Sequence, residues 1–459
     1  MTEITGLTAA ELSEAIHNRS VSCVEVMDAF LGRINTLNPD LNALVNLMSP
    51  EDCLAMALES DQQLSSGNSA GWLHGIPIAI KDLFNAKGLA TTLGSPLFQE
   101  IGAQQDDPHV ARIRAAGALI IAKTNVPEAG LGGHTRNALF GLTRNGVDRS
   151  LSAGGSSGGA ATAVSSHMLP LADGSDMMGS LRTPAAFQGI VGFRASAGAI
   201  PAATDADPQG LGLTSIGAMA RNVSDVSALF TTLRDDPAAR RQSPHGPSGD
   251  LKELRIGWLG DADGHWPMAK GVLAQCQRAL ENLQGPGAQI DLCSLPFSMA
   301  DLWLCWLTLR QRAMLADRAL YEDPRSRARM SDNWRWEIEQ GMQRGESDLL
   351  MAKTLRRDWL ATIERLFTQY DVLAAPAAQV FPFDAEAGPP TAIEGVSLEI
   401  YHEWLAISLP ASLAGLPVIS LPVAAGSATN LAGIQLMMPR GRDDHLLAIA
   451  TAAEQALLA

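Results

Sequence analysis

Residues 154–159 have the sequence Gly-Gly-Ser-Ser-Gly-Gly, in which two adjacent hydroxyl side chains lie between pairs of glycines. Glycine is the usual residue where a backbone must adopt left-handed angles or pass close to a ligand. Apolar segments flank this stretch directly, whereas a flexible linker would be more polar. We therefore expect a compact turn that presents the serines and free backbone N–H groups together, leading into a helix over residues 158–167.

The two serines also fit another motif. Residues 155–159 match Gly-x-Ser-x-Gly, the nucleophile elbow of α/β-hydrolases, which would make Ser157 the nucleophile. An elbow follows a strand directly, but the preceding residues 148–153 do not have the pattern of a strand. We therefore disfavour this interpretation.

Helical and strand patterns alternate along the rest of the chain. Residues 1–70 are expected to be helical, because Thr8 and Ser22 each precede a glutamate by three residues, the spacing of a capping box. Pro39 is expected to end the second helix. From about residue 75, short apolar runs alternate with helical stretches, which indicates an α/β sheet. The expected strands are residues 76–80, 118–122, 255–259, 372–375, 418–421 and 433–437, and the later helices are residues 108–116, 303–318 and 348–370.

Two segments have the composition of irregular structure. Residues 235–250 are polar, contain three prolines and are expected to form a surface linker. Residues 379–392 are also punctuated by proline and glycine and are expected to form a long loop.

The composition is that of an ordinary globular protein and excludes several classes. The 459 residues carry 34 Lys+Arg and 49 Asp+Glu, a formal net charge of −15. Nucleic acid is therefore not an expected partner, because its binding depends mainly on Lys and Arg. No apolar stretch reaches about 18 residues, so no membrane span is expected. The N-terminus lacks a secretory signal and the five cysteines are scattered, which favours free thiols and a cytoplasmic location.

The usual nucleotide and zinc motifs are absent from the sequence. There is no Gly-x-x-x-x-Gly-Lys-Ser/Thr, no Gly-x-Gly-x-x-Gly and no His-Glu-x-x-His, so neither a cofactor nor a metal is expected. His74, His134 and His167 lie near the Gly-rich segments, but a lone histidine is more often structural. We disfavour each of them as a general base.

Lys81 is the most informative of only six lysines, because it ends the apolar run of residues 75–80. Lys81 could reach solvent along its aliphatic stem or pair with Asp82. If it is buried instead, desolvation lowers its pKa and favours the neutral amine, which accepts a proton. A fall from about 10.4 to near neutral pH is roughly 3 units, or about 4 kcal/mol, which burial with one or two hydrogen bonds supplies.

Three separated elements share their order and spacing with a known family. They are residues 152–159, the run Gly-Ser-Leu-Arg-Thr-Pro-Ala-Ala-Phe at residues 179–187, and Lys81 in Gly-Ile-Pro-Ile-Ala-Ile-Lys-Asp. On these motifs the sequence resembles the amidase signature family. The matching motifs are dense over residues 75–226, and only a general similarity remains beyond them. The resemblance implies an α/β fold with a mixed central β-sheet flanked by helices on both faces.

The resemblance further implies one amidase-type domain over residues 1–459. Its parts would be a helical N-terminal part (1–70), a catalytic core (71–234), the surface linker (235–250) and a C-terminal part (251–459). The C-terminal part would complete the sheet and the substrate pocket.

Catalytic roles are also implied by the resemblance. Ser180 would be the nucleophile, Ser156 a bridging serine that follows a cis peptide bond, and Lys81 the base. Serine is a weak nucleophile at its free pKa and needs an adjacent acceptor for its proton. A neutral Lys81 can draw a proton from Ser156, which in turn draws one from Ser180, and the reverse path delivers a proton to the departing amine.

Oxyanion and substrate-binding groups would come from the residues around the nucleophile. They are the backbone N–H groups of Met177, Met178 and Gly179, together with Ser180 itself and Ser157. The family usually has two glycines before the nucleophile, where this chain has Met178-Gly179. We expect the two methionines to line the acyl pocket, because methionine is adaptable and apolar. Further apolar residues that could line it, although each is more often plain core, are Trp303, Trp306, Met437 and Met438.

The expected function is hydrolysis of a carboxamide C–N bond to a carboxylate and ammonia or an amine, through an acyl-enzyme on Ser180. The alternative is a glutaminase-type subunit of a transamidation complex, which the same family includes. A non-catalytic relative is disfavoured, because Lys81, Ser156 and Ser180 are all intact. The expected partner is a small-molecule amide of undefined size, and the sequence is compatible with a homodimer.

Overall fold

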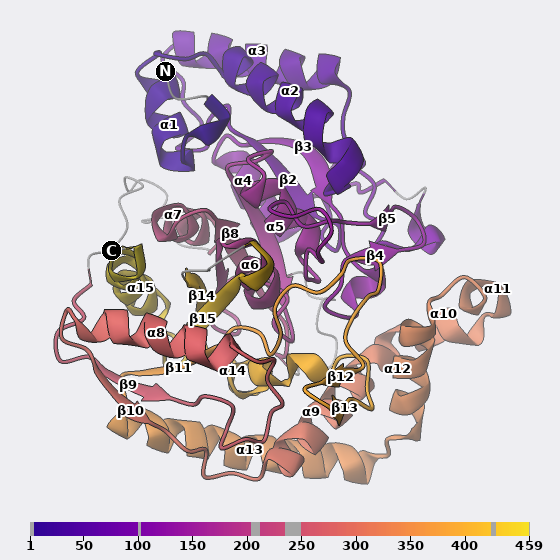
Figure 1. Cartoon of the computed structure of the whole chain (residues 1–459). Coiled ribbons are helices and arrows are strands. Elements are labelled where there is room, and N and C mark those ends of the chain that lie inside the picture. Colours follow the sequence, from indigo (N-terminus) through magenta and orange to yellow (C-terminus); the bar gives the residue numbers. More distant parts are fainter. Residues whose placement is uncertain (1–3, 100–101, 203–211, 235–248, 424–427, 459) are drawn as a thin grey trace.

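The computed structural model describes residues 4–99, 102–202, 212–234, 249–423 and 428–458, and Figure 1 shows how the elements are arranged. An eight-stranded sheet is its central element. From edge to edge the strands are β10 (Gln289–Leu292), β9 (Arg255–Trp258), β11 (Val372–Pro376), β15 (Ala432–Met437), β14 (Val418–Val423), β7 (Val191–Arg194), β8 (Ser215–Ala220) and β6 (Leu171–Asp176). The pairs β10–β9 and β9–β11 are parallel and the other neighbouring pairs are antiparallel, so the sheet is mixed, as expected.

This sheet takes strands from both sides of the expected linker. β6, β7 and β8 precede residues 235–250, and the other strands follow them. Apart from Gly249 and Asp250, the expected linker lies outside the described residues. The division of the chain into four parts therefore stays a prediction.

Helices cover both faces of the eight-stranded sheet. Side chains of a strand alternate between its faces, and in β11 Val372 and Ala374 join one buried cluster whereas Leu373 and Ala375 join another. The first cluster includes residues of α7 (Val223–Leu233), α8 (Val272–Gln284) and α15 (Asp443–Leu458). The second includes residues of α9 (Met299–Ala313), α13 (Glu346–Gln369) and α14 (Leu409–Ala414). The α/β fold expected from the sequence is thereby confirmed.

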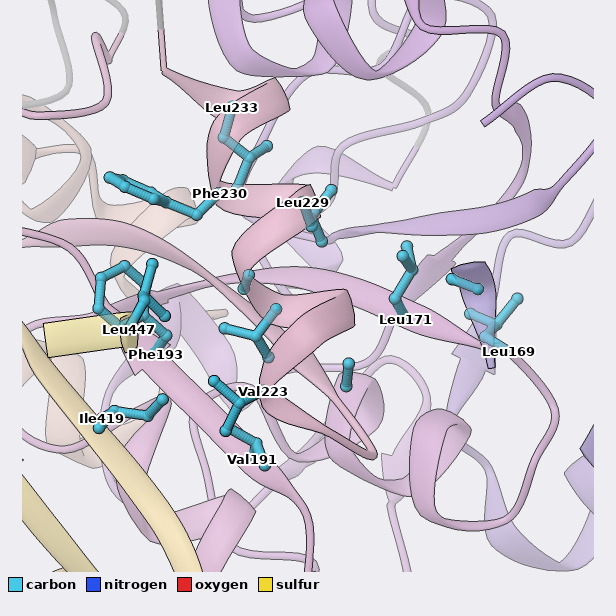
Figure 2. Packing of buried hydrophobic residues seen from close by; sticks show 14 of the residues in the cluster. Leu169, Leu171, Val191, Phe193, Val223, Leu229, Phe230, Leu233, Ile419 and Leu447 are labelled. Atoms are coloured by element: carbon cyan, nitrogen blue, oxygen red, sulfur yellow. The ribbon is translucent and has the colours of Figure 1, made fainter. Parts of the chain in front are cut away.

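Figure 2 shows part of the first cluster, where α7 packs on β7. The rings of Phe193 in β7 and Phe230 in α7 meet edge to face with centroids 5.0 Å apart. Ile419 of β14 and Leu447 of α15 lie in the same cluster. Such aromatic pairs contribute beyond the apolar area that they bury.

The N-terminal helices begin where their caps predict. α1 (Ala9–His17) and α2 (Cys23–Leu41) both start with complete capping boxes, at Thr8 and Ser22. The expectation that Pro39 ends α2 is wrong, since the helix continues to Leu41. Pro39 lies in the last turn, and the helix stops at Asn42, which adopts a left-handed conformation and donates its N–H to the Asn38 carbonyl.

The helices expected after the N-terminal part are present, with one interruption. α4 (Pro108–Ala115) and α13 lie close to the expected ranges 108–116 and 348–370. The helix expected over residues 303–318 is interrupted, because α9 ends at Ala313 and a short 3₁₀ turn, Met314–Asp317, precedes α10 (Arg318–Glu322). Further helices of the described residues are α3 (Pro50–Ser65), α6 (Arg182–Gln188), α11 (Pro324–Arg327) and α12 (Asp332–Gln343).

The loop expected over residues 379–392 is also observed. It contains neither helix nor strand before β12 (Ala392–Ile393), which pairs with β13 (Val396–Ser397). A second short hairpin is formed by β4 (Arg136–Asn137) and β5 (Gly141–Leu142).

A three-stranded sheet places Lys81 beside the eight-stranded sheet. It consists of β1 (Leu44–Val45), β3 (Leu119–Thr124) and β2 (Pro77–Lys81), with β2 and β3 parallel. The backbone N–H of Lys81, at the end of β2, donates to Asp173 Oδ1 of β6 at 2.8 Å. In Figure 1 these strands lie between the N-terminal helices and the rest of the molecule.

Close approach of β7 and β8 gives a test of the sheet register. A Cβ added to Gly217 would lie 1.8 Å from the Phe193 carbonyl oxygen, whereas one added to Gly32 in α2 would meet nothing within 4 Å. Gly217→Ala should therefore lower the urea midpoint, because the strands must separate to admit the methyl group. Gly32→Ala should stabilise the protein by about 0.4–1 kcal/mol. Equal midpoints for the two variants would contradict this register.

Candidate active site

The Gly-rich turn is compact, as expected. The peptide bond between Gly155 and Ser156 is cis, at the position that the resemblance implies. A Cβ at Gly158 would lie 2.2 Å from Thr135 Oγ1, and one at Gly159 would lie 2.4 Å from the Asn125 backbone nitrogen. These glycines therefore allow neighbouring segments to approach closely. α5 (Gly158–Ser165) starts directly after the turn and ends two residues before the expected limit.

Lys81 lies in the interior and its amine contacts the serines of this turn. The side chain is fully buried. Its Nζ lies 2.9 Å from Ser156 Oγ and 2.7 Å from Ser157 Oγ. The same nitrogen lies 3.1 Å from Ser175 Oγ and 3.2 Å from the Ser175 carbonyl oxygen. Both alternatives for Lys81 are therefore wrong, because it does not reach solvent and its neighbour Asp82 pairs with Lys123 instead, at 3.4 Å.

Burial lowers the pKa of the Lys81 amine to about 7, although the charges of Asp173 and Asp176 act in the opposite direction. Desolvation disfavours the charged form of a buried amine. At neutral pH a substantial share of Lys81 is therefore uncharged. A neutral amine has a lone pair that can accept a proton from a hydroxyl in contact with it.

The turn that leads to Ser180 is organised by the buried carboxylate of Asp176. Its Oδ1 accepts from the Gly179 N–H at 2.9 Å and its Oδ2 from the Leu181 N–H at 3.1 Å. Arg182 donates to both oxygens, at 2.8 and 2.9 Å. Burial alone would raise the pKa of Asp176, but Arg182 and Arg194 hold it well below its usual value. Asp176 is therefore ionised and fixes the backbone on both sides of Ser180.

Arg182 joins this turn to the C-terminal part of the chain. Its guanidinium also donates to the Ser408 carbonyl at 3.0 Å, to Gln435 Oε1 at 2.9 Å and to Ser412 Oγ at 2.8 Å. Because the guanidinium is planar and has five N–H donors, one side chain can link all these groups in a fixed geometry.

One pocket contains both of the serines expected to react. Ser156 and Ser180 line it, and so do Met177 and Met178, as expected of the two methionines. Ser180 is 8% exposed. The other apolar candidates do not line this pocket in the described structure: Trp306 and Met437 belong to the second buried cluster, Met438 belongs to the first, and Trp303 packs against the second.

The expected oxyanion donors differ in their availability. The Gly179 N–H is already bound to Asp176, so it is not free in this structure. Among the described residues, none accepts a hydrogen bond from the backbone N–H of Met177, Met178 or Ser180. Ser157 contacts Lys81 instead, and its backbone N–H donates to the Ser180 carbonyl at 3.2 Å. The donor set proposed below is therefore Met177, Met178 and Ser180.

Similarity to known proteins identifies the family of this chain. The sequence matches the family profile described as Amidase over residues 25–447. The chain belongs to the amidase signature family. An acylamidase of Rhodococcus erythropolis is 30% identical over 455 residues, which cover 96% of this chain and 93% of the relative. A glutamyl-tRNA(Gln) amidotransferase subunit from Acidothermus cellulolyticus is 30% identical over 503 residues, covering 99% of this chain and 95% of the relative.

Solved structures agree with this assignment. A bacterial aryl acylamidase of the amidase signature family matches with a TM-score of 0.88 at 24% identity, covering 98% of this chain and 96% of the other. A structure described as an amidase matches with a TM-score of 0.85 at 27% identity, covering 98% and 100%. The chain is therefore an amidase signature hydrolase that acts on C–N bonds.

The five cysteines are buried and free. None of the described helices combines the length and the apolar character that crossing a membrane requires. No three His, Cys, Asp or Glu side chains of the described ranges gather closely enough to hold a metal ion.

The histidines singled out in the sequence lie outside the pocket lining. His74 contacts the Ser60 carbonyl at 2.9 Å, His134 contacts Ser152 Oγ at 2.9 Å and His167 contacts the Thr5 carbonyl at 3.2 Å. Burial lowers the pKa of His134 to about 4. These histidines therefore have structural partners.

Sequence reasoning missed four polar residues that line this pocket, Ser175, Thr214, Arg310 and His402. Arg310 lies within the otherwise mainly apolar α9, and His402 precedes a 3₁₀ helix, Glu403–Ser408. The only available signal was a charged residue in an apolar helical stretch. Nothing in the sequence indicates that two segments so far apart in the chain meet at the pocket.

The Asp176–Arg182 pair yields a stability prediction. Asp176→Asn leaves the buried Arg182 without its carboxylate, and breaking a buried pair in this way costs about 3–5 kcal/mol. Urea unfolding should show this loss. Asp40→Asn is the matched control, because the Asp40–Arg149 pair is exposed at both ends and such pairs contribute about 1 kcal/mol or less. Similar losses in both variants would contradict the structural role of Asp176.

Proposed function

We propose that the chain is a free-standing serine amidohydrolase that cleaves a carboxamide through an acyl-enzyme on Ser180. The observation that carries this proposal is the contact of the buried amine of Lys81 with Ser156, in the wall of the pocket that Ser180 also lines. The family membership supports the reaction type, because this hydrolase family acts on C–N bonds. That the substrate is a small-molecule carboxamide is also part of this proposal.

Acylation begins when Ser180 Oγ attacks the carbonyl carbon of the amide. Its proton passes to Ser156 Oγ, whose own proton passes to the lone pair of Lys81. The negative charge that develops on the carbonyl oxygen is held by the backbone N–H groups of Met177, Met178 and Ser180. Losing one such donor typically costs about 2.7–4 kcal/mol of transition-state stabilisation.

Collapse of this tetrahedral intermediate breaks the C–N bond. The protonated Lys81 returns its proton through Ser156 to the departing nitrogen, which leaves as ammonia or an amine. A water molecule then attacks the acyl group on Ser180, and the same relay removes its proton. Lys81 returns the relayed proton through Ser156 to Ser180, and the product leaves as a carboxylic acid. This acid gives its remaining proton to the released amine or to solvent and becomes the carboxylate, so the protons balance over one cycle.

A second candidate is the glutaminase-type subunit of a transamidation complex. Relatives named as a glutamyl-tRNA(Gln) amidotransferase subunit share 30% identity with this chain, as the acylamidase does. Both candidates would use the same proposed catalytic side chains, so these side chains do not favour either one. Rapid hydrolysis of simple amides by the purified chain, without partners, would support the free-standing enzyme over the subunit. The homodimer stays a prediction.

The pKa of Lys81 predicts the pH dependence. Since burial lowers that pKa to about 7, the free amine, and with it kcat/KM, should rise about tenfold per pH unit below 7 and level off above it. Lys81→Ala should reduce turnover at neutral pH by about 10²- to 10⁴-fold. Lys87→Ala, which removes an exposed lysine, is the control and should keep the wild-type profile. A profile of Lys81→Ala that retains the midpoint near 7 excludes Lys81 as the base.

The nucleophile is tested by trapping. Incubation of the wild type with a slowly turned-over acylating inhibitor should place the acyl group on Ser180, as peptide mass spectrometry will show. Ser180→Ala should fold, by circular dichroism, but take up no label and hydrolyse no amide, because the attacking oxygen is gone. Ser150→Ala, at an exposed serine, should be labelled normally. Label on Ser157 would instead support the nucleophile-elbow interpretation and refute this proposal.

A further inference from the structure

The pocket contains a second polar group of side chains besides the serines. Arg310 and His402 line the same pocket as Ser180 and are 4% and 1% exposed. The apolar side chains that line this pocket include Met177, Met314 and Leu405. In apolar pockets a few buried polar groups commonly fix the orientation of a ligand. The proposed reaction does not use either of these two side chains.

Arg310 has a donor that no oxygen or nitrogen of the described residues occupies. Its Nε donates to Glu337 Oε1 at 2.6 Å and its Nη2 donates to Tyr401 Oη at 2.8 Å. Tyr401 in turn donates to Glu337 Oε1 at 2.7 Å, so the guanidinium is held in place. Within the described residues the one hydrogen-bond partner of Nη1 is the sulfur of Met177, at 3.7 Å, and a thioether is a weak acceptor. Because Met177 and Arg310 both line the pocket, this donor is available to a ligand there.

His402 supplies an independent observation. Neither of its ring nitrogens has a hydrogen-bond partner among the described residues, and Nε2 lies 3.6 Å from Glu337 Oε1. Burial and the charge of Arg310 hold the pKa of His402 well below its usual value, so the ring is neutral. A neutral ring has one donor and one acceptor. Leaving buried polar groups unpaired is costly, and a ligand in the pocket would relieve that cost.

We propose that the substrate carries, besides the scissile amide, a neutral group with a hydrogen-bond-accepting oxygen, such as a second carboxamide, which binds Arg310 and His402. This inference rests on the proposed function and specifies the substrate class of the same site. The group is neutral because Glu337 already balances the charge of Arg310. A substrate carboxylate would place a second anion on one buried guanidinium, and an ammonium group would face that guanidinium directly.

The test uses the full-length wild type and two matched series of synthetic amides. In the acyl series, p-nitroanilides carry a carboxamide, carboxylate, isopropyl or aminomethyl group at the end of an acyl chain of varied length. In the amine series, the same end groups are placed on the amine side of butanamides. In at least one series the carboxamide should exceed the isopropyl compound in kcat/KM by about 10- to 100-fold, the effect of a hydrogen bond to a charged group. The carboxylate and aminomethyl compounds should fall below the carboxamide.

Variants identify the residues responsible. Arg310→Met combined with Glu337→Gln removes the donor without leaving a buried carboxylate unpaired, and should bring the carboxamide-to-isopropyl ratio close to one. His402→Phe should lower the same ratio. Arg318→Met is the control, because Arg318 is exposed and pairs with Glu322. Using a ratio within each variant cancels any general loss of activity or folding.

The outcomes separate this inference from the proposed function. Equal kcat/KM for carboxamide and isopropyl compounds in both series, or a preference for the carboxylate, overturns the inference while Ser180-dependent hydrolysis upholds the proposed function. An unchanged ratio in the Arg310→Met/Glu337→Gln variant overturns the assignment of Arg310. If the purified wild type hydrolyses no amide at all, the proposed function fails and this inference fails with it.

Discussion

Burial of the Lys81 amine is the constraint on which the proposed chemistry depends. An exposed lysine is protonated at neutral pH and has no lone pair to offer, so it cannot act as a base there. In this chain β2 carries the side chain into the interior, where it contacts serine hydroxyls rather than a carboxylate. Burial lowers its pKa to about 7, and the charges of Asp173 and Asp176 limit the fall. A direct carboxylate partner would have kept the amine charged.

Asp176 links this electrostatic balance to the geometry of Ser180, the proposed nucleophile. Its carboxylate accepts from the backbone N–H groups of Gly179 and Leu181, on either side of Ser180, and pairs with Arg182. The same negative charge acts on Lys81 through space. Arg182 then connects the turn to Ser408, Ser412 and Gln435 of the C-terminal part. The turn that holds Ser180 therefore also depends on residues far along the chain.

Local patterns predicted much of the fold, whereas the resemblance to the amidase signature family indicated Lys81, Ser156 and Ser180 as site residues. The capping boxes at Thr8 and Ser22 depend only on neighbours in sequence, so they were predictable, as was the strand that buries Lys81. The end of α2 was not, because a left-handed residue after Pro39, and not the proline, decides where the helix stops. The hydrogen bond from the Gly179 N–H to Asp176 forms only in the folded turn, so it could not be predicted from the sequence.

Arg310 and His402 illustrate a further limit, since they meet at the pocket only through tertiary packing. The resemblance was dense over residues 75–226, which contain Lys81, Ser156 and Ser180, and weak where Arg310 and His402 lie. In the two proposals, bond cleavage and substrate choice therefore depend on different parts of the chain. Residues that move protons tolerate few replacements, because their distances are fixed by the reaction. A motif can therefore identify the reaction type, while the structure is needed to argue for its substrate.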